Sequence, residues 1–182
     1  MSRGALLTGT AGGIIGTIDS AIGIIWCVAF FIMPRNYLWF YTGPSTFTIV
    51  ISILFMALLL VALILTGIGF YGLYTIGGHS MGVVALIFGI IGGAAFLILG
   101  LVDLFAGSYV LTAVGLLILL VSFIIIGVAS IVMREVTMNP SAALAAGILS
   151  IIGGIFAGAI IGFGLLFVAF LLWAIVFYNT EA

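Results

Sequence analysis

The sequence predicts an all-α fold, an integral membrane helical bundle with five transmembrane helices. Two features of composition lead to this prediction. The 182 residues include only three Lys or Arg and four Asp or Glu, whereas 66% are apolar and the mean hydropathy is +1.64. A soluble domain usually has about 25% charged residues, so a charged share of 4% indicates a chain surrounded by lipid. The same scarcity of charge excludes nucleic acid as a partner, because that surface needs clustered Lys and Arg.

Five apolar stretches are long enough to cross a bilayer, which takes about 20 residues. The prolines and asparagines fall at or beside the ends of these stretches, as expected for residues that break or cap helices. All five belong to a single transmembrane domain, residues 1–182. The predicted spans are residues 6–33, 47–74, 81–102, 110–133 and 141–178.

The last stretch, residues 141–178, allows two interpretations. As one helix, its 38 residues would be about 57 Å long, well beyond a bilayer core of about 30 Å. As two helices, it needs a turn near residues 158–164, where only Gly, Ala, Ile and Phe would meet the headgroups. Backbone groups left open in lipid cost several kcal/mol each. We therefore expect one long, tilted helix and five spans, with six spans as the alternative.

An odd number of spans places the two termini on opposite sides of the membrane. Arg3 and Arg134 then share one side, and Arg35 lies on the other. The positive-inside rule predicts a cytoplasmic N-terminus and a C-terminus outside, in the cell membrane. Most interfacial aromatic residues, including Trp173 and Tyr178, would gather on the C-terminal side, since Trp and Tyr favour interfaces.

Glycine accounts for 26 of the 182 residues, and small residues recur three or four positions apart within the spans. In lipid, such faces let helix backbones approach closely. They predict packing within the bundle, and they also suit docking of other membrane subunits or of a second copy. The predicted packing residues are Gly12, Gly16, Gly89 and Gly93, together with a stripe along the last span formed by Ser150, Gly154, Gly158 and Gly162.

Asp19 lies near the middle of the first predicted span, flanked by Thr17 and Ser20. An ionised side chain at that depth costs at least about 2.5 to 3.5 kcal/mol. One hypothesis is a proton or ion site that Asp19 forms with these hydroxyls and with Thr66. In the alternatives, Asp19 is a neutral acid bonded to a neighbouring helix, or it lies at the cap of a helix that begins at Ser20.

The remaining reactive groups fit no catalytic or metal centre. His79, the only histidine, lies in a turn, Asp103 ends a span as an interfacial residue, and Arg134 and Glu135 form a solvated pair. A single cysteine, Cys27, excludes an intramolecular disulfide. We expect no enzyme activity, no metal and no cofactor, with bound membrane lipids as the expected small-molecule partners.

Three short runs are rich in glycine and isoleucine or aromatic residues. They are Ile-Gly-Phe-Tyr-Gly-Leu-Tyr at residues 68–74, and Ile-Ile-Gly-Gly at both 90–93 and 151–154. Over residues 46–178 the composition resembles that of uncharacterised Gly/Ile-rich multi-pass membrane proteins of thermoacidophilic archaea. The resemblance implies a small accessory protein of an archaeal membrane. It brings no catalytic residues with it.

Three functions are compatible with this composition. The scarcity of polar groups and the abundance of small helix faces favour a non-catalytic integral subunit that packs into a larger membrane protein complex, such as a respiratory complex. The alternative is a small proton or ion channel or transporter that uses Asp19. A weak sequence similarity between segments about 60 residues apart supports this alternative, because transporters often contain internal repeats. The third hypothesis is a homo-oligomeric membrane-organising protein.

Overall fold

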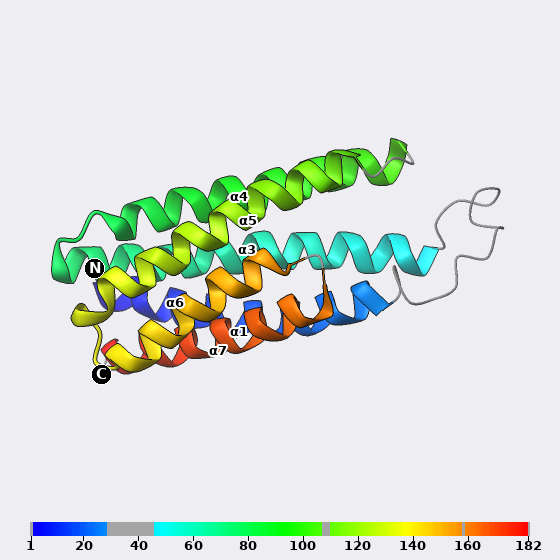
Figure 1. Ribbon diagram of the computed structural model, residues 1–182. Coiled ribbons are helices and arrows are strands. Elements are labelled where there is room, and N and C mark those ends of the chain that lie inside the picture. Colours follow the sequence, from blue (N-terminus) through cyan, green and yellow to red (C-terminus); the bar gives the residue numbers. More distant parts are fainter. Residues whose placement is uncertain (1, 29–45, 107–109, 158, 182) are drawn as a thin grey trace.

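The computed structural model describes residues 2–28, 46–106, 110–157 and 159–181. These ranges form helices joined by turns, with no strand among them (Figure 1). The elements are α1 (Ser2–Cys27), α3 (Thr46–Gly77), α4 (Met81–Ala106), α5 (Val110–Val132), the short 3-10 helix η2 (Met133–Val136), α6 (Pro140–Ile155) and α7 (Ile160–Glu181).

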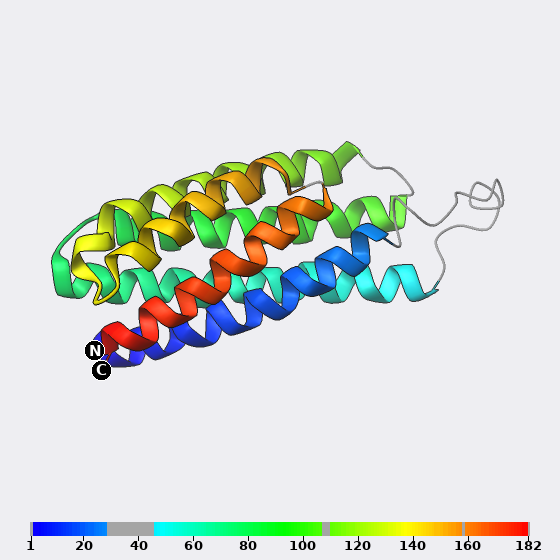
Figure 2. The same ribbon diagram turned by 60° about the horizontal axis from the view of Figure 1, so that its bottom comes forward.

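The long helices form a ring in chain order. Each runs antiparallel to the one before it and packs against it (Figures 1 and 2). The last helix, α7, packs against the first, α1, and this contact closes the ring. Each helix therefore has two principal neighbours, one on either side.

The prediction of a helical bundle with five membrane-length helices is confirmed. The helices that are long and apolar enough to cross a membrane are Arg3–Cys27, Ile49–Gly77, Met81–Ala106, Val110–Val136 and Ile160–Thr180. Helix α6 is also apolar, but its 16 residues extend only about 24 Å. The part of the first predicted span beyond residue 28 lies outside the described residues.

The expectation of one helix over residues 141–178 is wrong, because the chain turns back after Ile155 and α7 begins at Ile160. The turn avoids open backbone groups through local hydrogen bonds. The Phe156 amide donates to the Ile152 carbonyl at 3.1 Å, and the Ala159 amide donates to the Phe156 carbonyl at 2.8 Å. Since these donors need neither water nor headgroups, they lower the cost expected of an apolar turn.

This turn also changes the topology. The two termini lie at the same end of the bundle (Figures 1 and 2), and not at opposite ends as expected from five spans. The turn between α6 and α7 lies short of the other end, where α1, α3, α4 and α5 continue beyond it (Figure 1). The small stripe predicted along residues 150–162 is divided as well, because Ser150 and Gly154 lie on α6 and Gly162 on α7. Gly158 lies outside the described residues.

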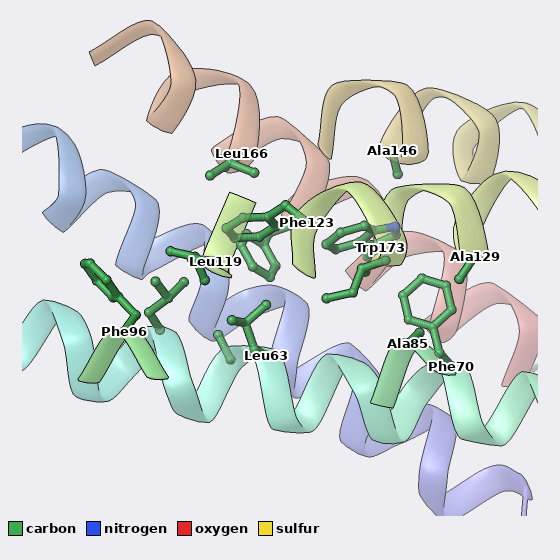
Figure 3. Packing of buried hydrophobic residues seen from close by; sticks show 14 of the residues in the cluster. Leu63, Phe70, Ala85, Phe96, Leu119, Phe123, Ala129, Ala146, Leu166 and Trp173 are labelled. Atoms are coloured by element: carbon green, nitrogen blue, oxygen red, sulfur yellow. The ribbon is translucent and has the colours of Figure 1, made fainter. Parts of the chain in front are cut away.

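Aromatic and aliphatic side chains fill the interior of the ring (Figure 3). Phe55 of α3 meets Phe163 of α7 edge to face at 5.3 Å between ring centroids. Phe123 of α5 meets Phe170 of α7 in the same way at 6.1 Å. Neither pair joins neighbouring helices of the ring, so these contacts cross its interior. Trp173, predicted at an interface, belongs to this core and is 0% exposed.

Glycines mark the seams where neighbouring helices touch. Gly9 of α1 and Gly69 of α3 are so close that a Cβ built on either would lie within 2.7 Å of the Cα of the other. Between α5 and α6, a Cβ on Gly127 or Gly147 would lie 2.6 Å from the carbonyl oxygen of the other glycine. Real Cβ atoms do not approach this closely, so these crossings require glycine.

The seam between α1 and α3 predicts a large effect for Gly12→Ala. The added methyl group would overlap the backbone nitrogen of Thr66, and backbone cannot swing aside as a side chain can. We expect a loss of about 1 to 3 kcal/mol in the free energy of unfolding, typical of overpacking, measured by denaturation in detergent micelles. The control is Gly4→Ala on the same helix, where nothing lies within 4 Å. An equal loss in both variants would contradict a specific contact at Gly12.

The fold predicts that both termini lie on one side of the membrane. Single cysteines added at each terminus of a Cys27→Ser chain should react with an impermeant maleimide from the same side. A cysteine at His79, which is exposed in the turn between α3 and α4 at that same end of the bundle, is the matched control. Labelling of the C-terminal position from the side opposite to His79 would contradict the α6–α7 turn.

Candidate functional site

Asp19 lies on the buried stripe of α1. Along this helix the buried positions recur every three or four residues, the spacing that places side chains on one helix face. This face packs against α3 on one side and α7 on the other. Asp19 is 0% exposed. The stripe comprises Leu6, Gly9, Gly12, Gly13, Gly16, Asp19, Ser20, Gly23, Trp26 and Cys27.

The register of the α1–α3 seam gives the level of Asp19. Gly12 lies against Thr66, and the Trp26 indole donates to the Ser52 hydroxyl at 2.9 Å. Asp19 is midway between these two contacts, level with the buried Leu59 of α3. Its surroundings along α3 are therefore apolar.

On the other side of Asp19, helix α7 is equally apolar. Gly16 lies against the ring of Phe170, and Gly23 lies against the ring of Phe163. Asp19 falls between these two levels. Both phenylalanines and the intervening Leu166 are buried in the core.

Within the described part of the chain, neither carboxyl oxygen of Asp19 has a hydrogen-bond partner. The two neighbouring hydroxyls bond to the backbone of α1 itself: Thr17 donates to Gly13 and Ser20 donates to Gly16, each at 2.8 Å. The structure therefore does not bring these three residues together as a site. Asp19 does not cap a helix either, since α1 continues unbroken through it.

The Thr66 hydroxyl also lacks a partner among the described residues. It does not bond to Asp19, because Thr66 lies at the level of Gly12, seven residues or about 10 Å along the helix from Asp19. The α1–α3 seam thus holds two separate unpaired polar groups. An ionised carboxylate without a partner is strongly disfavoured in apolar surroundings, so this packing accommodates Asp19 as the neutral acid.

Asp103 has a structural role that the sequence did not indicate. It is buried, 2% exposed, and its carboxyl oxygen accepts a hydrogen bond from the backbone amide of Thr112 in the first turn of α5. Free amides and partial positive charge at a helix N-terminus favour an acidic partner. Asp103 therefore lies near the end of its span, as expected, and it also ties the end of α4 to the start of α5.

A further polar group joins three helices. The Trp173 indole of α7 donates to the Ser130 hydroxyl of α5 at 3.0 Å, and that hydroxyl donates to the Ala143 carbonyl of α6 at 2.8 Å. Sequence reasoning missed this group, because it placed Trp173 at the membrane surface. The shared property of these residues is burial, which composition does not reveal.

The predicted packing residues lie between helices of the same chain where they are described, except Gly162. Gly12, Gly89 and Gly93 lie against α3, Gly16 against α7, and Gly154 against α5, while Gly162 contacts the α6–α7 turn. The Ser150 hydroxyl donates to the Phe123 carbonyl at 3.1 Å.

The structure assembles no metal centre from its described residues: no group of three or more His, Cys, Asp or Glu side chains could hold an ion there. His79 is exposed in the turn after Gly78, whose φ of +72° suits glycine.

The fold defines a class, the multi-pass helical bundles embedded in a membrane. Comparison of the chain with protein-family models, with curated proteins and with solved structures gives no match.

The lack of a partner for Asp19 predicts that Asp19→Leu stabilises the bundle. Leucine has the same branching of heavy atoms as aspartic acid, but it buries no polar group. We expect a gain of about 1 to 3 kcal/mol in the free energy of unfolding, measured in detergent micelles. Asp19→Asn, which keeps an unpaired polar group, should give no gain. A loss of stability in Asp19→Leu would show that Asp19 makes a favourable contact.

The Trp173–Ser130 group predicts a loss of stability in Ser130→Ala, because the indole N–H would lose its acceptor in the core. The expected loss is about 1 to 3 kcal/mol in the same unfolding measurement. Ser122→Ala is the matched control on α5. Ser122 is also buried, but its hydroxyl bonds only to the Ile118 carbonyl of its own helix. Equal losses of unfolding free energy in the two variants would contradict a stabilising hydrogen-bonded contact between helices at Ser130.

Proposed function

We propose that the chain is a non-catalytic integral subunit that packs into a larger membrane protein complex. The observation that supports this proposal is the filled interior of the ring, where aromatic side chains of α3, α5 and α7 meet. Polar groups such as Ser130, Ser150 and Asp103 join helices of the chain itself. The outer surface is then the part of the molecule through which it acts.

That surface is apolar along the helices. On α5, Leu117 is 63% exposed, and on α4, Ile98 is 60% exposed. Such a surface binds acyl chains or the apolar helices of other membrane proteins. Among helices in lipid, association depends on shape and packing because the lipid is equally apolar. A partner subunit would therefore fit the outline of the bundle and would need no charged contact.

The alternative of a small proton or ion channel or transporter has weaker support from this geometry. A transport pathway needs polar groups that line a cavity. At the level of Asp19, the facing residues of α3 and α7 are apolar, and rings from opposite sides meet in the interior. A homo-oligomeric membrane-organising protein would use the same outer surface, and only the identity of the partner separates it from a subunit.

Site-specific photo-crosslinking in the native membrane tests the proposal. A photoreactive residue at the outward Leu117 or Ile98 should link the chain to a different membrane protein, and the same protein should co-purify in a fixed ratio after gentle solubilisation. The matched control is Leu119, two residues from Leu117 on α5 but 1% exposed. A probe there should form links within the chain only.

Two outcomes would contradict a subunit role. A single species of 19.0 kDa with adducts to lipid alone would indicate a protein that works by itself. Adducts at multiples of that mass would indicate a homo-oligomer.

A further inference from the structure

The position of Asp19 has a consequence that goes beyond packing into a complex. The carboxyl group is fully buried, lacks a hydrogen-bond partner among the described residues, and faces apolar stretches of α3 and α7. A carboxylic acid in this place can stay neutral only by keeping its proton. Ionisation would leave a charge with no counter-charge at its level among the described residues of α3 and α7, which is strongly disfavoured in apolar surroundings. The packed bundle and the bound proton therefore depend on each other.

No other titratable side chain shares the level of Asp19 on the described parts of the two helices packed against it. On α3, Tyr71 and Tyr74 flank Gly72, which lies beside Leu6 in the first turns of α1. On α7, Tyr178 follows Phe177, which lies beside Gly9. Glu181 lies further along α7, at its end. These groups are at least three helical turns from Asp19.

The packing of α1 against α3 and α7 is suited to loosen when Asp19 becomes charged. On the side facing α3 and α7, the helix offers glycines at residues 9, 12, 13, 16 and 23. The first three lie against backbone atoms of α3 or α7, and the last two lie against phenylalanine rings. The Trp26–Ser52 hydrogen bond crosses the α1–α3 seam near its end. Thr66, on that same seam, is a second buried polar group without a partner. Polar contacts therefore do little to hold the middle of α1 in place.

We propose that Asp19 is a proton-binding site, and that its bound proton is required for α1 to stay packed between α3 and α7. When the proton is bound, the acid fits the apolar seam. When α1 leaves the bundle and the carboxyl group reaches water at the membrane surface, the group ionises and releases the proton. Because α1 closes the ring on both sides, this single site controls whether the ring is closed. The ligand of the site is the proton itself.

Infrared spectroscopy of the full chain in detergent micelles tests whether the proton is bound. At neutral pH the wild type should show the carbonyl stretch of a protonated carboxylic acid, and Asp19→Asn should lack it. Asp103→Asn is the matched control and should keep the band, because that variant leaves Asp19 intact. If Asp19→Asn loses the band of an ionised carboxylate and not the band of the protonated acid, the proposal is overturned.

A second measurement tests the coupling to α1. Cys27, the only cysteine, is on α1 and 1% exposed, so its rate of thiol labelling reports opening of that helix. The ratio of the labelling rate in wild type to that in Asp19→Leu should rise by up to about tenfold per pH unit, the limit for release of one proton. The intrinsic pH dependence of the thiol cancels in this ratio. If Asp19→Leu does not fold, Asp19→Asn serves as the reference in its place, because it also has no proton to release. A ratio that stays constant with pH would overturn the proposal.

Discussion

Close approach of helix backbones at glycine is the constraint on which this structure depends. In lipid there is no gain from moving apolar side chains out of water, so helices associate through contact area and shape. The crossings at Gly9–Gly69 and Gly127–Gly147 leave no room for a Cβ. Such crossings bring each helix against its neighbour around the ring, and they set the distance at which aromatic side chains can meet across the interior. The high glycine content thus produces the packing and also the filled core.

Several buried polar side chains also make contacts between helices. Ser130, Ser150 and Asp103 each bond to a group on a neighbouring helix or helix end. A buried polar group is tolerated in an apolar interior when it is bonded, and each of these also fixes the register of two helices. Asp19 and Thr66 are the exceptions, since both are fully buried and neither has a partner among the described residues, and of the two only Asp19 is ionisable. That contrast makes Asp19 the position at which a functional explanation is most needed.

Much of the fold could be predicted from the sequence, because a helix that crosses lipid requires a long apolar stretch and the chain has few polar residues to confuse the pattern. The division of residues 141–178 could not, since it depends on hydrogen bonds between the amides of Phe156 and Ala159 and nearby carbonyls. Likewise, the role of Asp103 depends on the amide of Thr112, and that of Trp173 depends on Ser130. Hydropathy identified Asp19 as unusual, but only the packing showed that neither Thr17 nor Ser20 is its partner.

The short α6–α7 turn gives the described part of the molecule a different cross-section at its two ends. At the end that holds the termini, every helix of the ring contributes to the cross-section. Beyond the turn, the described cross-section consists of α1, α3, α4 and α5 (Figure 1). A neighbouring helix or lipid therefore meets a narrower described body beyond the turn than around the termini.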